Sequence, residues 1–144
     1  MLVQQILKSK PDDGVVTIAP GSTIAEAAAM LSSRRIGAVV VSPDGKAVAG
    51  ILSERDIVRE LGKRGPACMA DLVDDIMTAT IVSCGRDESS DAVLEKMTAG
   101  RFRHMPVMDG AEMVGLISIG DVVKAQISHL SMEKEALEGM IKGF

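Results

Sequence analysis

The segment GILSERD at residues 50–56 occurs again, in altered form, as GLISIGD at residues 115–121. Both copies contain a glycine, two apolar residues, a serine, two variable residues and an aspartate. A serine followed three residues later by an acidic side chain is common at helix starts, because both side chains can bond to free backbone amides. Capping alone would accept Thr, Asn or Asp nearly as well as Ser. Retention of Ser and Asp in both copies therefore indicates a role beyond capping.

The similarity between the two copies extends over about half of the chain in each case. Residues 16–31 align with residues 82–97 at an offset of 66, and residues 35–45 align with residues 101–110 after removal of one residue near the turn. A repeat of this length indicates two copies of one structural unit.

Each copy predicts the order strand, helix, strand, strand, helix from its apolar periodicity and its turn residues. The turns at residues 43–45 and 109–110 predict a hairpin in each copy. Four helices are predicted. The first begins at a capping box at Thr23, the second and third span residues 54–63 and 90–99, and the fourth begins near Gly120. Strands are predicted at residues 15–18, 38–42, 48–52, 81–83, 105–108 and 113–117.

The predicted fold class is α+β, with tandem β-α-β-β-α repeats packed sheet to sheet about a pseudo-twofold axis. About 60 residues rarely supply a sufficient core alone, so the halves should pack against each other. The predicted units are residues 1–65 (first repeat with an N-terminal helix), 66–78 (linker), 79–128 (second repeat) and 129–144 (C-terminal helical extension). Apolar residues in that extension predict a contact with a partner or with the core.

Composition excludes several functional classes. A net charge of −4 argues against a general nucleic-acid binder, which needs a dense cationic surface. The chain shows no apolar run that could span a bilayer and no signal-peptide pattern, so we expect a cytoplasmic protein without a membrane partner. Because Trp and Tyr are absent, a flat ligand would have to lie between aliphatic side chains and backbone.

Motifs for catalysis and metal binding are absent from the sequence. Cys68 and Cys84 lack metal-type or redox-type spacing, so we expect free thiols and no metal site. No Walker-type loop, no His and carboxylate cluster and no nucleophile with an adjacent base is recognisable. The sequence therefore predicts that the protein is not an enzyme.

The repeated unit, ending each time in Gly, two apolar residues, Ser, two variable residues and Asp, resembles the CBS (cystathionine β-synthase) domain pair, or Bateman module. The resemblance covers essentially the whole chain and includes DIMT at residues 75–78, a stretch that commonly leads into the second repeat. It implies an inter-repeat cleft for an adenosine-containing ligand: AMP, ADP, ATP, NAD or S-adenosylmethionine. The adenine nucleotide would be a regulatory ligand and not a catalytic cofactor.

The resemblance also implies two sets of ligand-binding residues. Asp56 and Asp121 would accept hydrogen bonds from ribose hydroxyls, and the serines would contact ribose or phosphate. The first predicted site consists of Val16, Ile36, Gly37, Ala38, Ser53, Arg55 and Asp56. The second predicted site consists of Thr80, Val82, Arg103, His104, Met105, Pro106, Ser118 and Asp121.

The two predicted sites are not equivalent. Arg103 and His104 stand where the first repeat has Gly37 and Ala38, so we expect the second site to hold phosphates more firmly, aided by Arg55 from the first repeat. For His104 itself, phosphate binding and a solvent-facing strand position remain equal alternatives.

The leading hypothesis is a stand-alone regulatory module that binds an adenine nucleotide or NAD and signals energy or redox state to an unidentified effector protein by population shift. The resemblance also implies a homodimer. The alternative is a ligand-free structural or protein–protein interaction module in which Ser and Asp only cap helices.

Overall fold

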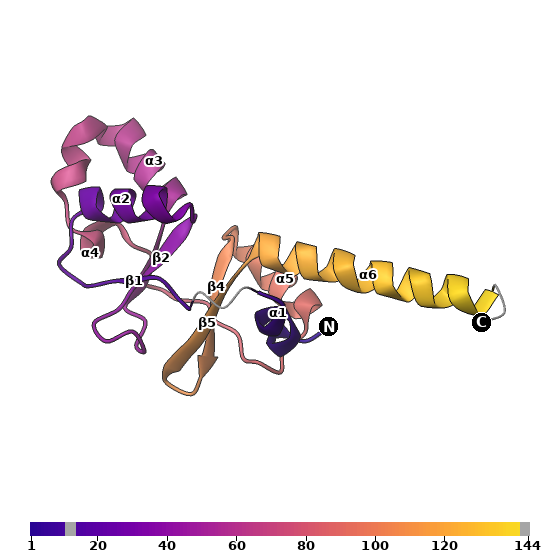
Figure 1. Cartoon of the computed structure of the whole chain (residues 1–144). Helices are drawn as coiled ribbons and strands as arrows, with labels where there is room; N and C mark the ends of the chain where they lie inside the picture. The colour runs from indigo at the N-terminus through magenta and orange to yellow at the C-terminus, as the bar shows by residue number, and fades with distance from the viewer. Residues whose placement is uncertain (11–13, 142–144) are drawn as a thin grey trace.

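The computed structural model describes residues 1–10 and 14–141 (Figure 1). Two halves, each with a sheet and helices, follow one another along the chain, and one long helix extends from the second half. In chain order the elements are α1 (Val3–Ser9), β1 (Thr17–Ile18), α2 (Ile24–Arg34), β2 (Ala38–Val41), β3 (Gly50–Ser53), α3 (Glu54–Arg64), the 3-10 helix η1 (Gly65–Ala70), α4 (Val73–Ile76), α5 (Ser90–Gly100), β4 (His104–Asp109), β5 (Glu112–Ser118) and α6 (Ile119–Ile141).

The first half has the predicted strand-helix-strand-strand-helix order. β1 pairs in parallel with β2, and β2 pairs antiparallel with β3. Thr23 begins α2 as expected: its hydroxyl accepts a hydrogen bond from the amide of Glu26 at 3.2 Å. The side chains of this half's core are mainly aliphatic, and they include Ile24, Val39, Val41, Leu52 and Val73.

In the second half, the strand predicted at residues 81–83 is not formed. Only an isolated parallel bridge, Cys84 with Val107, takes its place. In the first half, the amide of Val40 donates to the carbonyl of Val16 at 3.2 Å. The equivalent of Val40 is Pro106, which has no N–H to donate to Val82, so the parallel ladder cannot extend toward residue 81.

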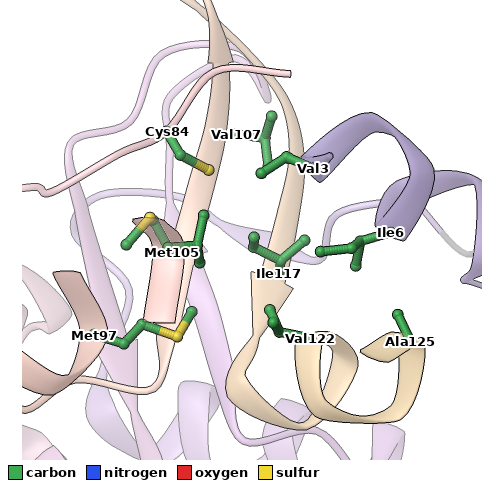
Figure 2. Packing of buried hydrophobic residues seen from close by; sticks show 10 residues of the cluster. Val3, Ile6, Cys84, Met97, Met105, Val107, Ile117, Val122 and Ala125 are labelled. Atoms are coloured by element: carbon green, nitrogen blue, oxygen red, sulfur yellow. The ribbon is translucent and has the colours of Figure 1, made fainter. Parts of the chain in front are cut away.

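The core of the second half is built from β4, β5, α5, the start of α6, and α1 (Figure 2). Val3 and Ile6 of α1 are fully buried there, although the sequence groups α1 with the first repeat in residues 1–65. In Figure 2 both side chains point toward Val107 and Ile117 of the hairpin. The N-terminal helix therefore packs on the second repeat.

The reciprocal arrangement holds for the segment that precedes the second repeat. Val73 of α4 is buried in the core of the first half. Its amide donates to the carbonyl of Ser22 at 2.8 Å, just as the amide of Val3 donates to the carbonyl of Glu88 at 2.8 Å. Each repeat thus covers the core of the other with its N-terminal segment, which ties the two halves together.

The glycine that leads each motif copy lies directly against the exchanged segment of the other repeat. A Cβ at Gly115 would lie 2.7 Å from Leu7 Cδ2 of α1, too close for two carbon atoms. A Cβ at Gly50 would overlap the side chain of Met77, which directly follows α4. A side chain at either position would force Leu7 or Met77 to move from its place against the sheet.

Helix α6 contains the predicted C-terminal extension. Val122 and Ala125 are buried against the second half, and Gln126 Nε2 donates to Ser90 Oγ at 2.9 Å. Beyond this point the helix projects away from the body (Figure 1), and every residue from 127 to 138 is exposed.

Several absences hold for residues 1–10 and 14–141. None of their helices combines the length and apolarity that a bilayer span requires, and none of their His, Cys, Asp and Glu side chains form a group of three suited to a metal ion. Cys68 and Cys84 are free and buried. Burial raises the pKa of the Cys84 thiol to about 11, so this thiol stays protonated at neutral pH and is a poor redox sensor.

Candidate functional site

The first motif copy forms the junction between β3 and α3. Ser53 is the N-cap of α3, and its backbone amide donates to Asp56 Oδ2 at 2.9 Å. The Ser53 hydroxyl lies 3.0 Å from the same oxygen. Asp56 Oδ1 accepts a hydrogen bond from Arg59 Nη1 at 3.2 Å. Ser53 and Asp56 therefore cap α3, as the helix-capping interpretation of the motif predicts. The Asp56 carboxylate is also held by Arg59.

The capped helix start borders a cavity of about 420 Å³. One wall comes from the first repeat, where Ser53 and Asp56 lie at the N-terminus of α3. The other wall comes from residues 78–82, which follow α4, and from residues 100–104, which connect α5 to β4. Small-molecule sites commonly have volumes of roughly 300–1,000 Å³, so a nucleoside-sized ligand is compatible with this space.

The connection between α5 and β4 brings cationic side chains to the cavity. α5 ends at Gly100, and Arg101 adopts a left-handed conformation with φ 56°, which closes the helix and reverses the chain. Arg101, Arg103 and His104 line the cavity as a result. Arg35 has the same conformation, with φ 54°, at the end of α2 in the first repeat.

The cavity carries a positive electrostatic character on its rim. Arg55 and Arg59 from α3 face the same space as Arg101 and Arg103. The N-terminus of α3 adds the partial positive charge of a helix dipole. Against these, Glu54 and Asp56 supply carboxylates. The arrangement suits a ligand with both hydroxyl donors and an anionic group.

His104 lines the cavity beside Gly37 of the first repeat. A Cβ at Gly37 would lie 3.4 Å from both Cε1 and Nε2 of its ring, so the glycine leaves room for the imidazole. Burial lowers the pKa of His104, and this effect outweighs the opposing influence of Asp121 and Glu54. The imidazole is therefore mainly neutral at pH 7, and the two carboxylates that oppose this shift come from different repeats, Glu54 from the first and Asp121 from the second.

The second motif copy has the same cap geometry but different surroundings. The amide of Ser118 donates to Asp121 Oδ2 at 2.8 Å, and the amide of Asp121 donates to Ser118 Oγ at 3.0 Å. Lys10 Nζ lies 2.9 Å from Asp121 Oδ2 and also donates to the carbonyl of Leu116 at 2.6 Å. Burial raises the pKa of Asp121, but hydrogen bonds from Lys10 and Ser118 lower it more, so the net shift is downward.

The cavity combines residues from both predicted sites. Its lining includes Gly37, Ser53, Arg55 and Asp56 from the first set and Thr80, Val82, Arg103 and His104 from the second. Ser118 and Asp121 are not in this lining, so Arg103 and His104 face the cavity with the serine and aspartate of the other repeat. The remaining predicted residues also lie outside the lining, with Ala38, Met105 and Pro106 buried and Val16 and Ile36 packed on the first core.

Several cavity residues were not among the predicted ones. They are Ile51, Glu54, Arg59, Thr78, Ile81, Gly100, Arg101 and Phe102. Arg59 follows Arg55 by one helical turn, a spacing that could have placed both on one face of α3. Thr78 and Ile81 adjoin the predicted Thr80 and Val82. Nothing local in the sequence marks Phe102 or Gly100.

A family model for the CBS domain matches this chain twice, at residues 3–63 and 73–128. The chain belongs to the CBS domain family. The two matches cover the two structural repeats, and they confirm the predicted tandem α+β architecture. The resemblance inferred from the repeated motif is thus confirmed.

Known CBS proteins resemble the chain over most of its length. The CBS-domain containing protein ATU1752 from Agrobacterium tumefaciens shares 43% identity and a TM-score of 0.82, with 87% of this chain and 92% of that chain covered. The mitochondrial CBS domain-containing protein CBSX3 of Arabidopsis thaliana is 30% identical over 98% of this chain and 72% of its own length. Other curated Arabidopsis relatives are longer, and the chain spans 22–24% of them.

Ligands are bound in some of the structural relatives, including one above 25% identity. The CBS domain pair of protein MJ0100, in complex with 5′-methylthioadenosine and S-adenosyl-L-methionine, is 26% identical with a TM-score of 0.76. The match covers 90% of this chain and 98% of that chain. Both of its ligands contain adenosine, which is the ligand class expected from the repeated motif.

Proposed function

We propose that this CBS domain pair is a regulatory module that binds an adenosine-containing ligand in the cavity beside Ser53 and Asp56. The observation that carries the proposal is the composition of that cavity, where a serine and a carboxylate at one helix start face Arg103 and His104 of the other repeat. Adenosine-containing ligands in the pair of protein MJ0100 support the ligand class.

In this proposal, Asp56 receives the ribose. Its carboxylate is buried, yet it borders the cavity, and vicinal hydroxyls are suitable donors for its oxygens. Arg59 holds Oδ1 at 3.2 Å, which fixes the carboxylate in one orientation before a ligand arrives. Such preorganisation lowers the entropic cost of binding.

In a ligand that contains phosphate, the phosphate groups would lie near the arginine side chains of the cavity. Arg55 and Arg103 approach the cavity from different repeats, so a bound phosphate would connect the repeats directly. His104 would add a neutral donor or, once protonated, a further positive charge. We therefore favour a nucleotide such as AMP, ADP, ATP or NAD over ligands that lack phosphate.

Regulation follows from the position of the cavity between the repeats. A ligand that contacts both repeats stabilises the packing in which those contacts form, and its differential affinity sets the size of the shift. CBS-domain pairs are generally regulatory and not enzymatic, which supports a signalling role for this pair. The signal would pass to an effector protein; that partner, the homodimer and the cytoplasmic location remain predictions.

The test is direct identification of the ligand. Purified protein is denatured and filtered, and the filtrate is examined by ultraviolet absorbance and mass spectrometry, since a chain without Trp or Tyr contributes little absorbance itself. Stripped protein is then titrated calorimetrically with AMP, ADP, ATP, NAD, S-adenosylmethionine and methylthioadenosine. Saturable binding of at least one compound is expected. Failure of all six to bind would reject the proposal and favour the ligand-free interaction module.

A second assay addresses catalysis. Protein incubated with ATP or NAD is sampled over time for hydrolysis or transfer products by chromatography. Unchanged nucleotide is expected. Sustained turnover that is lost with the cavity variant Asp56→Ala would replace the regulatory proposal with an enzymatic one.

A further inference from the structure

Helix α6 carries an apolar stripe that the proposed ligand site does not use. The stripe consists of Val123, Ile127, Leu130, Leu137 and Ile141, with Lys134 as its one charged position. Its five apolar residues are all exposed, from 43% for Val123 to 85% for Ile141. The body of the protein is contacted by a different face, that of Val122 and Ala125.

The spacing of the stripe is that of a coiled-coil seam. Successive members are separated by four, three, four, three and four residues, the alternation of a and d positions in a heptad. Ile127, Lys134 and Ile141 are a positions, and Val123, Leu130 and Leu137 are d positions. At about 1.5 Å per residue the seam is about 27 Å long. Such a seam is the contact surface for another helix with the same periodicity.

We propose that this seam pairs with the same seam of a second copy of the chain, in an antiparallel orientation. The spacing reads identically in both directions, so one antiparallel alignment places each a position opposite a d position throughout. In this alignment Ile127 lies opposite Leu137 of the other copy, and Val123 lies opposite Ile141. Lys134 lies opposite Leu130, so its methylene stem can pack while its ammonium group reaches the solvent.

Charge on the flanks favours the antiparallel pair over the parallel one. In a parallel pair, Lys134 of one chain would face Lys134 of the other chain, and Glu133 would face Glu138 of the other chain. Both contacts would bring like charges together. In the antiparallel pair Lys124 and Glu138 are neighbours at each end. The two Glu133 side chains approach each other near the twofold axis at the middle of the helix pair. The ammonium groups of the two Lys134 side chains are within reach of both carboxylates there.

The shape of the molecule is also compatible with the antiparallel pair. The body contacts only the first turns of α6, and the rest projects freely (Figure 1). Antiparallel pairing puts the two bodies at opposite ends of the helix pair, and the end of each helix covers Val123 beside the other body. Because the seam has fewer heptads than most independent coiled coils, we expect a dimer that dissociates on dilution.

The first experiment measures molar mass by light scattering over a wide concentration range. The full chain should change from one to two times 15.1 kDa as concentration rises. Leu137→Glu should weaken the dimer by about tenfold or more, because it places a charge in the seam. Met132→Glu is the matched control, since Met132 is 66% exposed on the same helix but lies off the seam, and Leu137 is 60% exposed.

Each outcome decides the proposal. If the chain is monomeric at all concentrations, self-pairing is rejected, and the seam would then be a contact surface for a different protein. A dimer unaffected by Leu137→Glu, or weakened equally by Met132→Glu, would place the interface elsewhere. Thermal melting of each variant checks its fold, and both positions are far from the buried cores.

A cysteine experiment tests orientation independently. Ile127→Cys and Leu137→Cys chains are oxidised separately and as a mixture; the native Cys68 and Cys84 are buried. The antiparallel pair predicts a disulfide-linked dimer mainly in the mixture. Efficient linkage of either variant to itself would show a parallel pair and overturn the proposed orientation.

Discussion

The Ser-Asp pair of the first repeat borders an open cavity, whereas the equivalent pair of the second repeat forms an ion pair with Lys10. The cap geometry is nearly the same, with amide-to-carboxylate distances of 2.9 Å at Asp56 and 2.8 Å at Asp121. The motif therefore fixes the helix start in both repeats. The difference comes from what each exchanged N-terminal segment places beside it.

The exchanged segments show how this difference arises. Leu7 packs at Gly115 as Met77 packs at Gly50, so residues of the two segments correspond at an offset of 70. By this correspondence, the equivalent of Lys10 is Thr80, a short neutral residue that lines the cavity. Lys10 reaches Asp121 from the exchanged segment, whereas Thr80 supplies no charge beside Asp56, whose ion pair is with Arg59 of its own helix. One substitution outside the motif thus separates two otherwise similar helix starts.

The largest expected effect on ligand affinity comes from replacing Asp56, and Asp121 provides the comparison. Asp56→Ala should weaken nucleotide binding by roughly 10–100-fold, because a hydrogen bond to a charged group contributes about 1.5–3 kcal/mol. Asp121→Ala should change affinity by much less, since Asp121 is paired with Lys10 and lies outside the cavity lining. Calorimetric titration measures both. Equal losses in the two variants would show that the two motif copies are functionally equivalent despite the ion pair of Asp121 with Lys10.

Arg103 is expected to have the next largest effect. Arg103→Ala should lower affinity for a phosphate-bearing ligand by about tenfold and leave methylthioadenosine, which has no phosphate, nearly unchanged. Arg34→Ala, at an exposed end of α2, is the control for a general loss of positive charge. Equal weakening for both ligands would mean that Arg103 supports the fold of the cavity and not the phosphate.

The sequence predicted the repeated hairpins and helices because their signals are local: turn residues, caps and apolar periodicity. The missing strand at residues 81–83 depends on Pro106, whose effect appears only when the pairing partner is known. The exchange of α1 and α4 depends on contacts between distant segments, so residues 1–65 were grouped by chain order. For the same reason, the sequence groups Arg103 and His104 with Asp121 of their own repeat and does not show that they line one cavity with Asp56. His104 also remains close enough to Asp121 for that carboxylate to affect its pKa.

His104 should make phosphate binding dependent on pH. Burial lowers its pKa, so the free protein holds a neutral imidazole at pH 7. A bound phosphate would favour the protonated form, so affinity should rise by about 2–5-fold as the pH falls from 7.5 to 6.5. Titrations at several pH values check this, with His104→Gln expected to remove the dependence. A slope that persists in His104→Gln would assign the titration to another group.

The smallest expected effect concerns Lys10. Lys10→Thr gives the second repeat the residue found at the equivalent position of the first, and it should lower the free energy of unfolding at pH 7 by about 0.5–1 kcal/mol for a partly exposed pair. Because the pKa of Asp121 is lowered in the folded state, the stabilising contribution of the pair is complete above the ordinary value of 3.8. It is lost as the pH falls through the lower folded-state pKa.

Denaturant unfolding of both proteins across this pH range should therefore show a difference that shrinks in acid. Asp121→Asn is the matched background, because the amide keeps the shape of the side chain but does not ionise. In the Asp121→Asn background, Lys10→Thr should lower the free energy of unfolding by a nearly constant amount from pH 7 to acid. That amount would reflect only the loss of the hydrogen bond from Lys10 to the carbonyl of Leu116. If Lys10→Thr also raises the ligand stoichiometry above that of the unsubstituted chain, then Lys10 is what keeps a second adenosine site closed. Unchanged stoichiometry would instead assign Lys10 a purely structural role, with the asymmetry of the repeats set by Arg103 and His104.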